Sequence, residues 1–402
     1  MKKLISAILA ATMLVSLSAC NEKKDEETKA DTNPEAEITE EVSEEKAMAT
    51  ILSNSYYRLT VDKELNVAYL GGSITQGAGA SVYAKNWVAL TTAWLSEKFP
   101  EATINENNAG ISNTGSNYGI YRLEKDIFDV AIPDLIFIEY TSNDWGRFGE
   151  LNISRQNESI IRKLYEKNPK VDIVFLFTGF SHDGNCRRAS TALAKHYGLP
   201  IIDPGSQLKT LIDTEEGGVY DRYSNDKIHP NDEGYAFYIK CIDECFSKYL
   251  IDEAPEKAQY VDIVVPEALN KDGLFMNPQF TEALLYDAPE NFKHTSKSLK
   301  MGKIKYDYAL STDVEGAVFE FDFEGTGFGL LVYKTPKVSS IEYSVDGGEF
   351  IPYEIGDMHN YNHGQMYIIE HALESGKHNV KIRNVASQYG TELNILGVCT
   401  NK

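Results

Sequence analysis

Three residue types that serine-based acyl transfer requires occur at well-separated points of the sequence. Ser73 follows two glycines at the end of an apolar run, in VAYLGGSITQG at 67–77. Asp226 and His229 lie three residues apart in NDKIHP, just before a helical pattern. A serine hydroxyl becomes a nucleophile when an imidazole accepts its proton and a carboxylate orients that imidazole. The three residues therefore predict a catalytic triad, although a serine capping a glycine turn and a surface histidine are the ordinary interpretations of each part alone.

Acyl transfer also needs hydrogen-bond donors at the point where negative charge develops on the carbonyl oxygen. Gly110, in NNAGIS, offers a backbone N–H, and Asn143, in EYTSND, offers a side-chain amide. The backbone N–H of Ser73 is a third donor, because it lies at the expected start of a helix. We expect these three residues to form an oxyanion hole; a turn glycine at 110 and an Asx turn or helix cap at 143 remain the alternatives.

Short apolar runs that alternate with longer amphipathic segments must position these side chains. Strands are predicted at residues 66–71, 102–108, 134–140, 172–178 and 200–203, and helices at 87–99, 159–168, 189–198 and 231–250. Strands that alternate with helices indicate an α/β fold with a parallel sheet covered on both faces. Such sheets bind ligands at the carboxyl ends of their strands, where the candidate residues fall.

Four short blocks in this order resemble the SGNH (GDSL-type) hydrolase family. The four letters of that name fall on Ser73, Gly110, Asn143 and His229, and Asp226 completes the triad. The set is specific because four weak motifs rarely coincide in the right order. The resemblance implies a three-layer α/β/α sandwich with a flavodoxin-like parallel sheet, and serine esterase chemistry with no cofactor and no metal.

The resemblance covers roughly residues 62–250 and departs from the family pattern at two positions. Gly72 stands where the family usually has aspartate, and Thr141 stands where it usually has glycine. Neither change removes a catalytic group, so the GGSIT block resembles a branch of the superfamily. Gly72 deletes a side chain beside Ser73, which we expect to alter access or local hydrogen bonding.

A change of hydrophobic period marks a second domain. The hydrolase domain is predicted at 51–252, and a break follows at IDEAPEKAQ, 251–259. Alternating apolar residues and an Asp-Gly-Gly turn at 346–348 then replace the helical pattern. Residues 260–402 are therefore predicted to form an antiparallel β-sandwich or jelly roll.

The N-terminus is predicted to direct export. Residues 1–19 combine a basic start with an apolar run shorter than a membrane-spanning helix, and LSAC ends at Cys20. This pattern resembles a bacterial lipoprotein signal; a plain signal peptide with a chance cysteine is the alternative. Residues 20–50 are acidic and predict a disordered tether. We expect an extracytoplasmic protein whose only membrane contact is the lipidated Cys20.

Composition and domain pairing narrow the substrate. A formal net charge of −21 argues against a nucleic-acid partner, because phosphate binding needs a basic surface. In the superfamily that the chain resembles, catalytic domains joined to jelly-roll domains are often similar to carbohydrate esterases. With the predicted export, this resemblance implies an acetylesterase whose partner is an acylated carbohydrate or another small ester. A lipase or thioesterase for longer acyl chains, and a non-catalytic glycan-binding lipoprotein, remain alternatives.

Other side chains receive weaker predictions. Trp145 and His182 are candidate substrate-binding residues, whereas Trp87 is expected in the core because it lies in an amphipathic helix. Arg122 and Asp126 are spaced for an ion pair on a helix, which is ordinarily solvated.

Asp144 is expected to hold its loop by hydrogen bonds. No metal-binding pattern of cysteine and histidine is evident. An exported chain permits disulfides, but their pairing stays open among Cys186, Cys241, Cys245 and Cys399.

Overall fold

The computed structural model describes residues 51–181, 183–214, 220–355 and 362–402. The predicted signal peptide, Cys20, the acidic tether and His182 lie outside the described residues.

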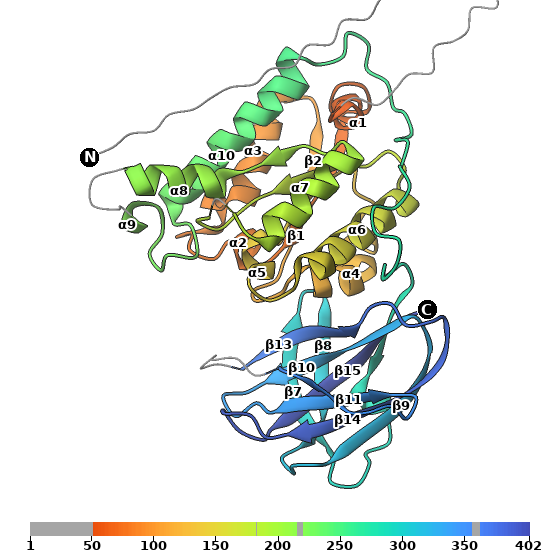
Figure 1. Cartoon of the computed structure of the whole chain (residues 1–402). Helices are drawn as coiled ribbons and strands as arrows, with labels where there is room; N and C mark the ends of the chain where they lie inside the picture. Colours follow the sequence, from red (N-terminus) through yellow and green to blue (C-terminus); the bar gives the residue numbers. More distant parts are fainter. Residues whose placement is uncertain (1–50, 182, 215–219, 356–361) are drawn as a thin grey trace, which may run out of the picture. The chain divides into compact units, whose positions relative to one another are not determined.

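A five-stranded parallel sheet forms the centre of the N-terminal domain (Figure 1). Its strands run in the order β2-β1-β3-β4-β5. They are β1 (Glu64–Gly71), β2 (Thr103–Gly110), β3 (Leu135–Glu139), β4 (Asp172–Leu176) and β5 (Ile201–Ile202). This is the flavodoxin-like order, in which ligands bind where the strand order reverses, beside the carboxyl end of β1. The predicted fold class is therefore confirmed.

Successive side chains of each strand enter different cores, because side chains alternate across a sheet. Val67 and Tyr69 join one hydrophobic cluster, whereas Ala68 and Leu70 join the other. Helices cover both faces (Figure 1). The first cluster contains residues of α3 (Trp87–Lys98), α8 (Pro204–Thr214) and α10 (Asp232–Ser247), and the second contains residues of α4 (Ser116–Arg122), α6 (Glu150–Lys167) and α7 (Asn185–Tyr197). Among the described residues, none of the helices has the length and apolarity that crossing a bilayer requires.

The sequence predicted the end of one helix correctly but missed the start of another. Gly198 ends α7 in the left-handed region at φ 68°, as its position in the sequence predicts. Helix α6 begins at Glu150, nine residues before the predicted start, because its polar first half is buried by tertiary contacts. The sequence pattern does not predict helix α8.

The remaining helical elements are short. They are α1 (Ser53–Tyr57), η1 (Arg58–Asp62), α2 (Ser73–Gln76), η2 (Tyr83–Lys85), η3 (Leu123–Phe128), α5 (Thr141–Asp144), α9 (Tyr220–Tyr223), η4 (Lys248–Asp252) and η5 (Ala283–Leu285).

Two antiparallel sheets form the C-terminal domain, as predicted. One has the order β13-β10-β15-β8-β7, with β6 also paired to β15; the other has the order β12-β11-β14-β9. Phenylalanine, leucine, isoleucine and valine side chains from both sheets share one buried cluster. The strands are β6 (Pro278–Glu282), β7 (Lys293–Met301), β8 (Ile304–Thr312), β9 (Val318–Gly325), β10 (Gly327–Lys334), β11 (Ser340–Val345), β12 (Ile351–Tyr353), β13 (His363–Glu370), β14 (Gly376–Val385) and β15 (Leu393–Asn401).

The two domains share buried contacts. Tyr118 of α4 and Tyr306 of β8 lie with their hydroxyl oxygens 3.0 Å apart in a common apolar cluster. The Asn117 side-chain amide donates to the backbone carbonyl of Met366. The segment before β6 lies along the α/β domain, where the Phe275 N–H donates to Ser159 Oγ at 2.9 Å. Within the described chain, Cys186, Cys241, Cys245 and Cys399 are free thiols, so the disulfides that export would permit do not form here.

Candidate active site

The structure brings Ser73, His229 and Asp226 into one hydrogen-bonded chain. Ser73 Oγ lies 2.8 Å from His229 Nε2, and His229 Nδ1 lies 2.6 Å from Asp226 Oδ2. An ionised carboxylate accepts from Nδ1–H, which leaves Nε2 as an acceptor for the serine hydroxyl. The arrangement can therefore carry a proton away from Ser73 Oγ.

The Asp226 carboxylate is held by the backbone of its own turn. Its Oδ1 accepts from the N–H groups of Ile228, at 2.9 Å, and His229, at 2.8 Å. Burial alone would raise the pKa of Asp226, but the hydrogen bonds from the imidazole and these two N–H groups outweigh it and lower the pKa to about 2. Asp226 is therefore ionised at neutral pH, and its carboxylate can orient the imidazole through the hydrogen bond from Nδ1–H.

Neighbouring residues fix the turn that carries His229. Asn231 caps helix α10 by accepting from the N–H groups of Glu233 and Gly234. Gly79 lies opposite with φ 91°, and a Cβ there would lie 2.3 Å from the carbonyl oxygen of Pro230. A residue with a side chain would push the two loops apart, so Gly79 allows the histidine turn to approach the serine turn.

Ser73 is the first residue of α2, directly after β1. A buried carboxylate supports this turn from the neighbouring strand. Glu139 Oε2 accepts from Thr75 Oγ1 at 2.7 Å and from the Gly72 N–H at 3.3 Å. Glu139 Oε1 accepts from Thr178 Oγ1 at 2.5 Å. Burial raises the pKa of Glu139 to about 7, against the opposing effect of these hydrogen bonds.

Gly72 lies against the side chain of Asn143. An ideal Cβ on Gly72 would lie 2.0 Å from Asn143 Oδ1. Asn143, in the short helix α5 after β3, therefore occupies the space that a side chain at 72 would fill. The carboxylate that is hydrogen-bonded to the backbone of this turn belongs to Glu139, at the end of β3.

Asn143 thus lies against the residue that precedes Ser73. Its Oδ1 is buried and has no hydrogen-bond partner among the described residues. Asp144, the next residue, accepts from the Ser116 N–H at 3.0 Å and so holds the loop, as predicted.

Gly110 lies at the end of β2, paired with Gly71, but its N–H is already engaged. It donates to Asn108 Oδ1 at 2.9 Å. A Cβ on Gly110 would lie 2.1 Å from the Gln76 backbone nitrogen, so helix α2 packs directly on this glycine. Close packing is thus a sufficient reason for glycine here, and the oxyanion role of Gly110 stays a prediction.

A cavity of about 470 Å³ lies beside the histidine and asparagine blocks. Ser142 and Ile228, the neighbours of Asn143 and His229, line it together with Trp145. Trp145 is 62% exposed, so its ring is available to a ligand at the mouth of the cavity. Phe180 and Tyr220 add aromatic walls.

Two predictions about buried residues had different outcomes. Trp87 is fully buried in the core, which confirms the prediction. Arg122 does pair with Asp126, at 3.1 Å, but the expectation of a solvated pair is wrong, because both side chains are buried. Arg122 also donates to the carbonyl oxygens of Ala109 and Gly71, at the ends of β2 and β1. The buried ion pair therefore connects the carboxyl ends of β1 and β2, next to the candidate site.

Sequence reasoning missed Glu139. The signal was present, since a glutamate at the end of the apolar run LIFIE is costly to bury without partners. What the sequence did not show is that its partners come from residues 72, 75 and 178. In the part of the chain that the structure describes, no three His, Cys, Asp or Glu side chains are grouped to hold a metal ion.

Residues 69–237 match the family model of the GDSL-like Lipase/Acylhydrolase family. This part of the chain is therefore similar to GDSL-like acylhydrolases. All three members of the hydrogen-bonded chain fall within the match. No curated protein matches the sequence.

Solved structures share the two-domain fold. A crystal structure of a two-domain esterase (CEX) active on acetylated mannans has a TM-score of 0.70 and 22% identity, covering 88% of this chain and 96% of that one. A second structure of such an esterase, co-crystallised with mannopentaose, gives a TM-score of 0.68 at 22% identity, covering 88% and 95%. The similarity in fold therefore extends over both the α/β domain and the β-sandwich.

Proposed function

We propose that the protein is an extracytoplasmic serine esterase that removes acyl groups, chiefly acetyl, from a polysaccharide. The observation that carries this proposal is the hydrogen-bonded chain from Ser73 through His229 to Asp226, within an acylhydrolase domain. The lipoprotein-like signal supports a location outside the cytoplasm, anchored at Cys20. The shared two-domain fold with an esterase active on acetylated mannans supports a carbohydrate substrate.

In the proposed mechanism His229 Nε2 takes the proton of Ser73 Oγ as that oxygen attacks the ester carbonyl. Asp226 fixes the imidazole through Nδ1–H and stabilises the imidazolium. The alcohol of the sugar leaves with the proton from His229, and an acyl-serine remains. Water then attacks the acyl carbon while His229 accepts its proton. His229 returns that proton to Ser73 Oγ as the acyl–oxygen bond breaks, so acetate is released and the free serine is restored.

The Ser73 N–H and the Asn143 side-chain amide are the donors proposed for the oxyanion. Asn143 lies against Gly72, so its amide belongs to the same turn as Ser73. The Gly110 N–H would join them only after exchanging its bond to Asn108.

The test compares wild type with Ser73→Ala on p-nitrophenyl acetate and on acetylated glycans. Ser73→Ala should lower kcat/KM by ~10³-fold or more, because only binding and oxyanion donors remain. Ser96→Ala is the matched control: Ser96 is an exposed serine whose hydroxyl bonds only within helix α3, to the Thr92 carbonyl. Equal rates for wild type and Ser73→Ala would refute the proposal.

Two further measurements separate the competing functions. A fluorophosphonate should label wild type on Ser73 and should not label Ser73→Ala. Failure to label, together with glycan binding, would instead support a non-catalytic lipoprotein. Rates that rise along a series from acetyl to octanoyl esters would favour a lipase or thioesterase.

A further inference from the structure

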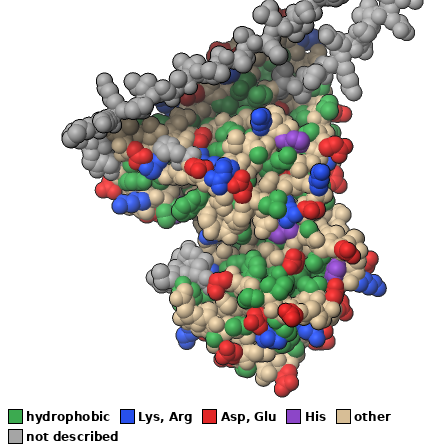
Figure 2. Space-filling model, in the orientation of Figure 1, with side chains coloured by type: hydrophobic (Ala, Val, Ile, Leu, Met, Phe, Trp, Pro, Cys, Tyr) green, Lys and Arg blue, Asp and Glu red, His purple; other side chains and the backbone are tan. Residues whose placement is uncertain are grey.

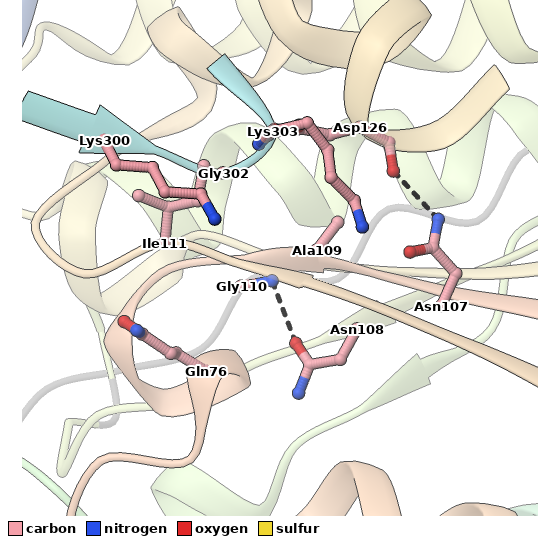
Figure 3. Close-up of a pocket in the computed structure, with 10 residues that line it drawn as sticks. All are labelled: Gln76, Asn107, Asn108, Ala109, Gly110, Ile111, Asp126, Lys300, Gly302 and Lys303. Carbon is pink, nitrogen blue, oxygen red and sulfur yellow. Dashed lines mark hydrogen bonds between the residues drawn. The ribbon is translucent and has the colours of Figure 1, made fainter. Parts of the chain in front are cut away.

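A second cavity, of about 390 Å³, lies where the β-sandwich meets the end of β2 (Figure 3). Its lining comes from two sources. Gln76, Asn108 and Gly110 belong to the acylhydrolase domain, whereas Lys300 and Lys303 belong to the hairpin between β7 and β8. Figure 3 shows the two lysine side chains reaching the cavity from the hairpin, opposite Gln76 and Asn108. The cavity is distinct from the aromatic one beside Trp145.

The hairpin tip is fixed on the acylhydrolase domain. The Lys303 N–H donates to Asp126 Oδ1 at 2.8 Å. Gly302 turns the chain with φ 63°, and a Cβ there would lie 2.3 Å from Asp126 Oδ2. Met301 is buried in an apolar cluster that includes Ile111. The lysine side chains therefore project from an anchored turn.

The cavity carries an excess of positive charge. None of the ion pairs between described residues involves Lys300 or Lys303, whereas Lys305 on the same hairpin pairs with Asp307 at 2.6 Å. The negative charge of Asp126 is already opposed by Arg122. Acidic side chains are frequent on the surface that Figure 2 shows, and the chain has a formal charge of −21. Asp126 also lines the cavity, but its charge is opposed by Arg122, so the two ammonium groups leave an excess of positive charge that favours an anionic ligand.

The amide side chain of Gln76 adds a donor. Gln76 Oε1 accepts from the N–H and hydroxyl of Ser112, at 2.9 and 2.6 Å. Its Nε2 hydrogens remain for a ligand. A carboxylate suits this set, because it accepts from both ammonium and amide donors.

The cavity lies close to the nucleophile. Gln76 is the last residue of α2, whose first residue is Ser73, and one helical turn rises only ~5.4 Å. Gly110, which also lines the cavity, is paired with Gly71 at the end of β1. Ser73 itself does not line the cavity, but Gln76, which does line it, lies within about one helical turn of Ser73 along α2.

We propose that this cavity is a subsite for a carboxylate-bearing sugar unit of the acylated polysaccharide, bound by Lys300 and Lys303. The inference rests on the proposed esterase function and narrows its substrate to acidic glycans. The β-sandwich then has a direct part in substrate choice, since it supplies both lysines.

The experiment measures kcat/KM for an acetylated polygalacturonate and for an acetylated neutral mannan of similar length. Wild type should prefer the acidic polymer, and added salt should reduce that preference because it screens the lysine charges. Lys300→Gln/Lys303→Gln should lower the acidic-to-neutral ratio by about tenfold or more, mainly through KM. Both substitutions leave the Lys303 backbone N–H bond intact. Lys305→Gln, which removes one positive charge from the same hairpin outside the cavity, should leave the ratio unchanged.

Two outcomes would overturn the inference. An unchanged acidic-to-neutral ratio of kcat/KM in the double variant would show that the two lysines do not contribute to the choice of substrate. An equal loss on both polymers would show a subsite for neutral sugar.

A binding measurement separates this inference from the esterase proposal. Full-length protein carrying Ser73→Ala is titrated with unacetylated oligogalacturonate, with and without the two lysine substitutions. Binding that weakens with those substitutions would support the subsite even if wild type hydrolysed no ester at all. Equal binding by both proteins would refute the subsite even if wild type proved to be an active esterase.

Discussion

Glu139→Gln should remove a pH dependence of stability that comes from the ionisation of Glu139, the buried carboxyl group that contacts the Ser73 turn. Burial raises the pKa of Glu139 from 4.5 to about 7. Between these values the folded protein binds a proton that the unfolded chain has released. The free energy of unfolding therefore falls as pH rises from about 4.5 to about 7, and the loss stays constant above that range.

The magnitude follows from the same pKa values. Each pKa unit corresponds to about 1.36 kcal/mol, so complete ionisation of Glu139 costs the native state on the order of 3 kcal/mol. Glutamine can keep the hydrogen bonds. Its oxygen accepts from the Gly72 N–H and Thr75, and its amide donates to Thr178, whose hydroxyl can reverse direction. Glu139→Gln should therefore match wild type near pH 4 and exceed its stability by up to ~3 kcal/mol near pH 8.

The assay is urea unfolding at a series of pH values, with the denaturant slope compared to confirm that the same transition is measured. Buried Asp144 and Asp172 have pKa values raised to about 6 and about 7, so only the difference between variant and wild type reports Glu139. Glu97→Gln, an exposed change of equal charge on α3, is the control and should give a constant difference.

Parallel stability curves for Glu139→Gln and wild type from pH 4 to 8 would refute this reasoning. They would mean that Glu139 does not change its ionisation on folding. Glu139→Ala adds a second arm. It should lose about 1–3 kcal/mol of stability relative to wild type near pH 4, because the Gly72 N–H loses its acceptor, and this loss should shrink toward pH 8, because the variant also lacks the carboxyl that ionises in wild type.

Three further predictions concern other parts of the site. Asp226→Asn should lower kcat on p-nitrophenyl acetate by ~10³–10⁴-fold, because the imidazole loses its oriented tautomer; a loss under tenfold would contradict the triad. Arg122→Met should lower the free energy of unfolding in urea by about 3–5 kcal/mol, since it leaves Asp126 buried without its cation; adding Asp126→Asn should recover part of this loss, and a change below about 1 kcal/mol would show that the pair is not buried in solution. Trp145→Ala should raise KM for an acetylated glycan while the melting temperature stays constant, because the ring is 62% exposed; an unchanged KM would exclude contact with substrate.

Within the fold, the sequence pattern predicted those features that depend on residues close together along the chain. Apolar runs located the parallel strands, and Gly198 marked the end of α7 because only the left-handed region closes a helix in that way. The start of α6 and the whole of α8 were missed. Both are amphipathic segments whose burial depends on what packs against them, and a polar residue such as Gln156 gives no sign of being enclosed.

For the candidate site, the sequence alone determined which residues are candidates for the chemistry, because the types and order of Ser73, Asp226 and His229 predicted the hydrogen-bonded chain that the structure contains. The tertiary structure alone decided how they are supported. Glu139 beneath Gly72, the buried pairing of Arg122 with Asp126, and the β7–β8 hairpin beside Gln76 join residues distant in sequence. A buried charge is costly unless a partner lies next to it in the folded protein. That partner can come from any point of the sequence, so the sequence alone does not identify it.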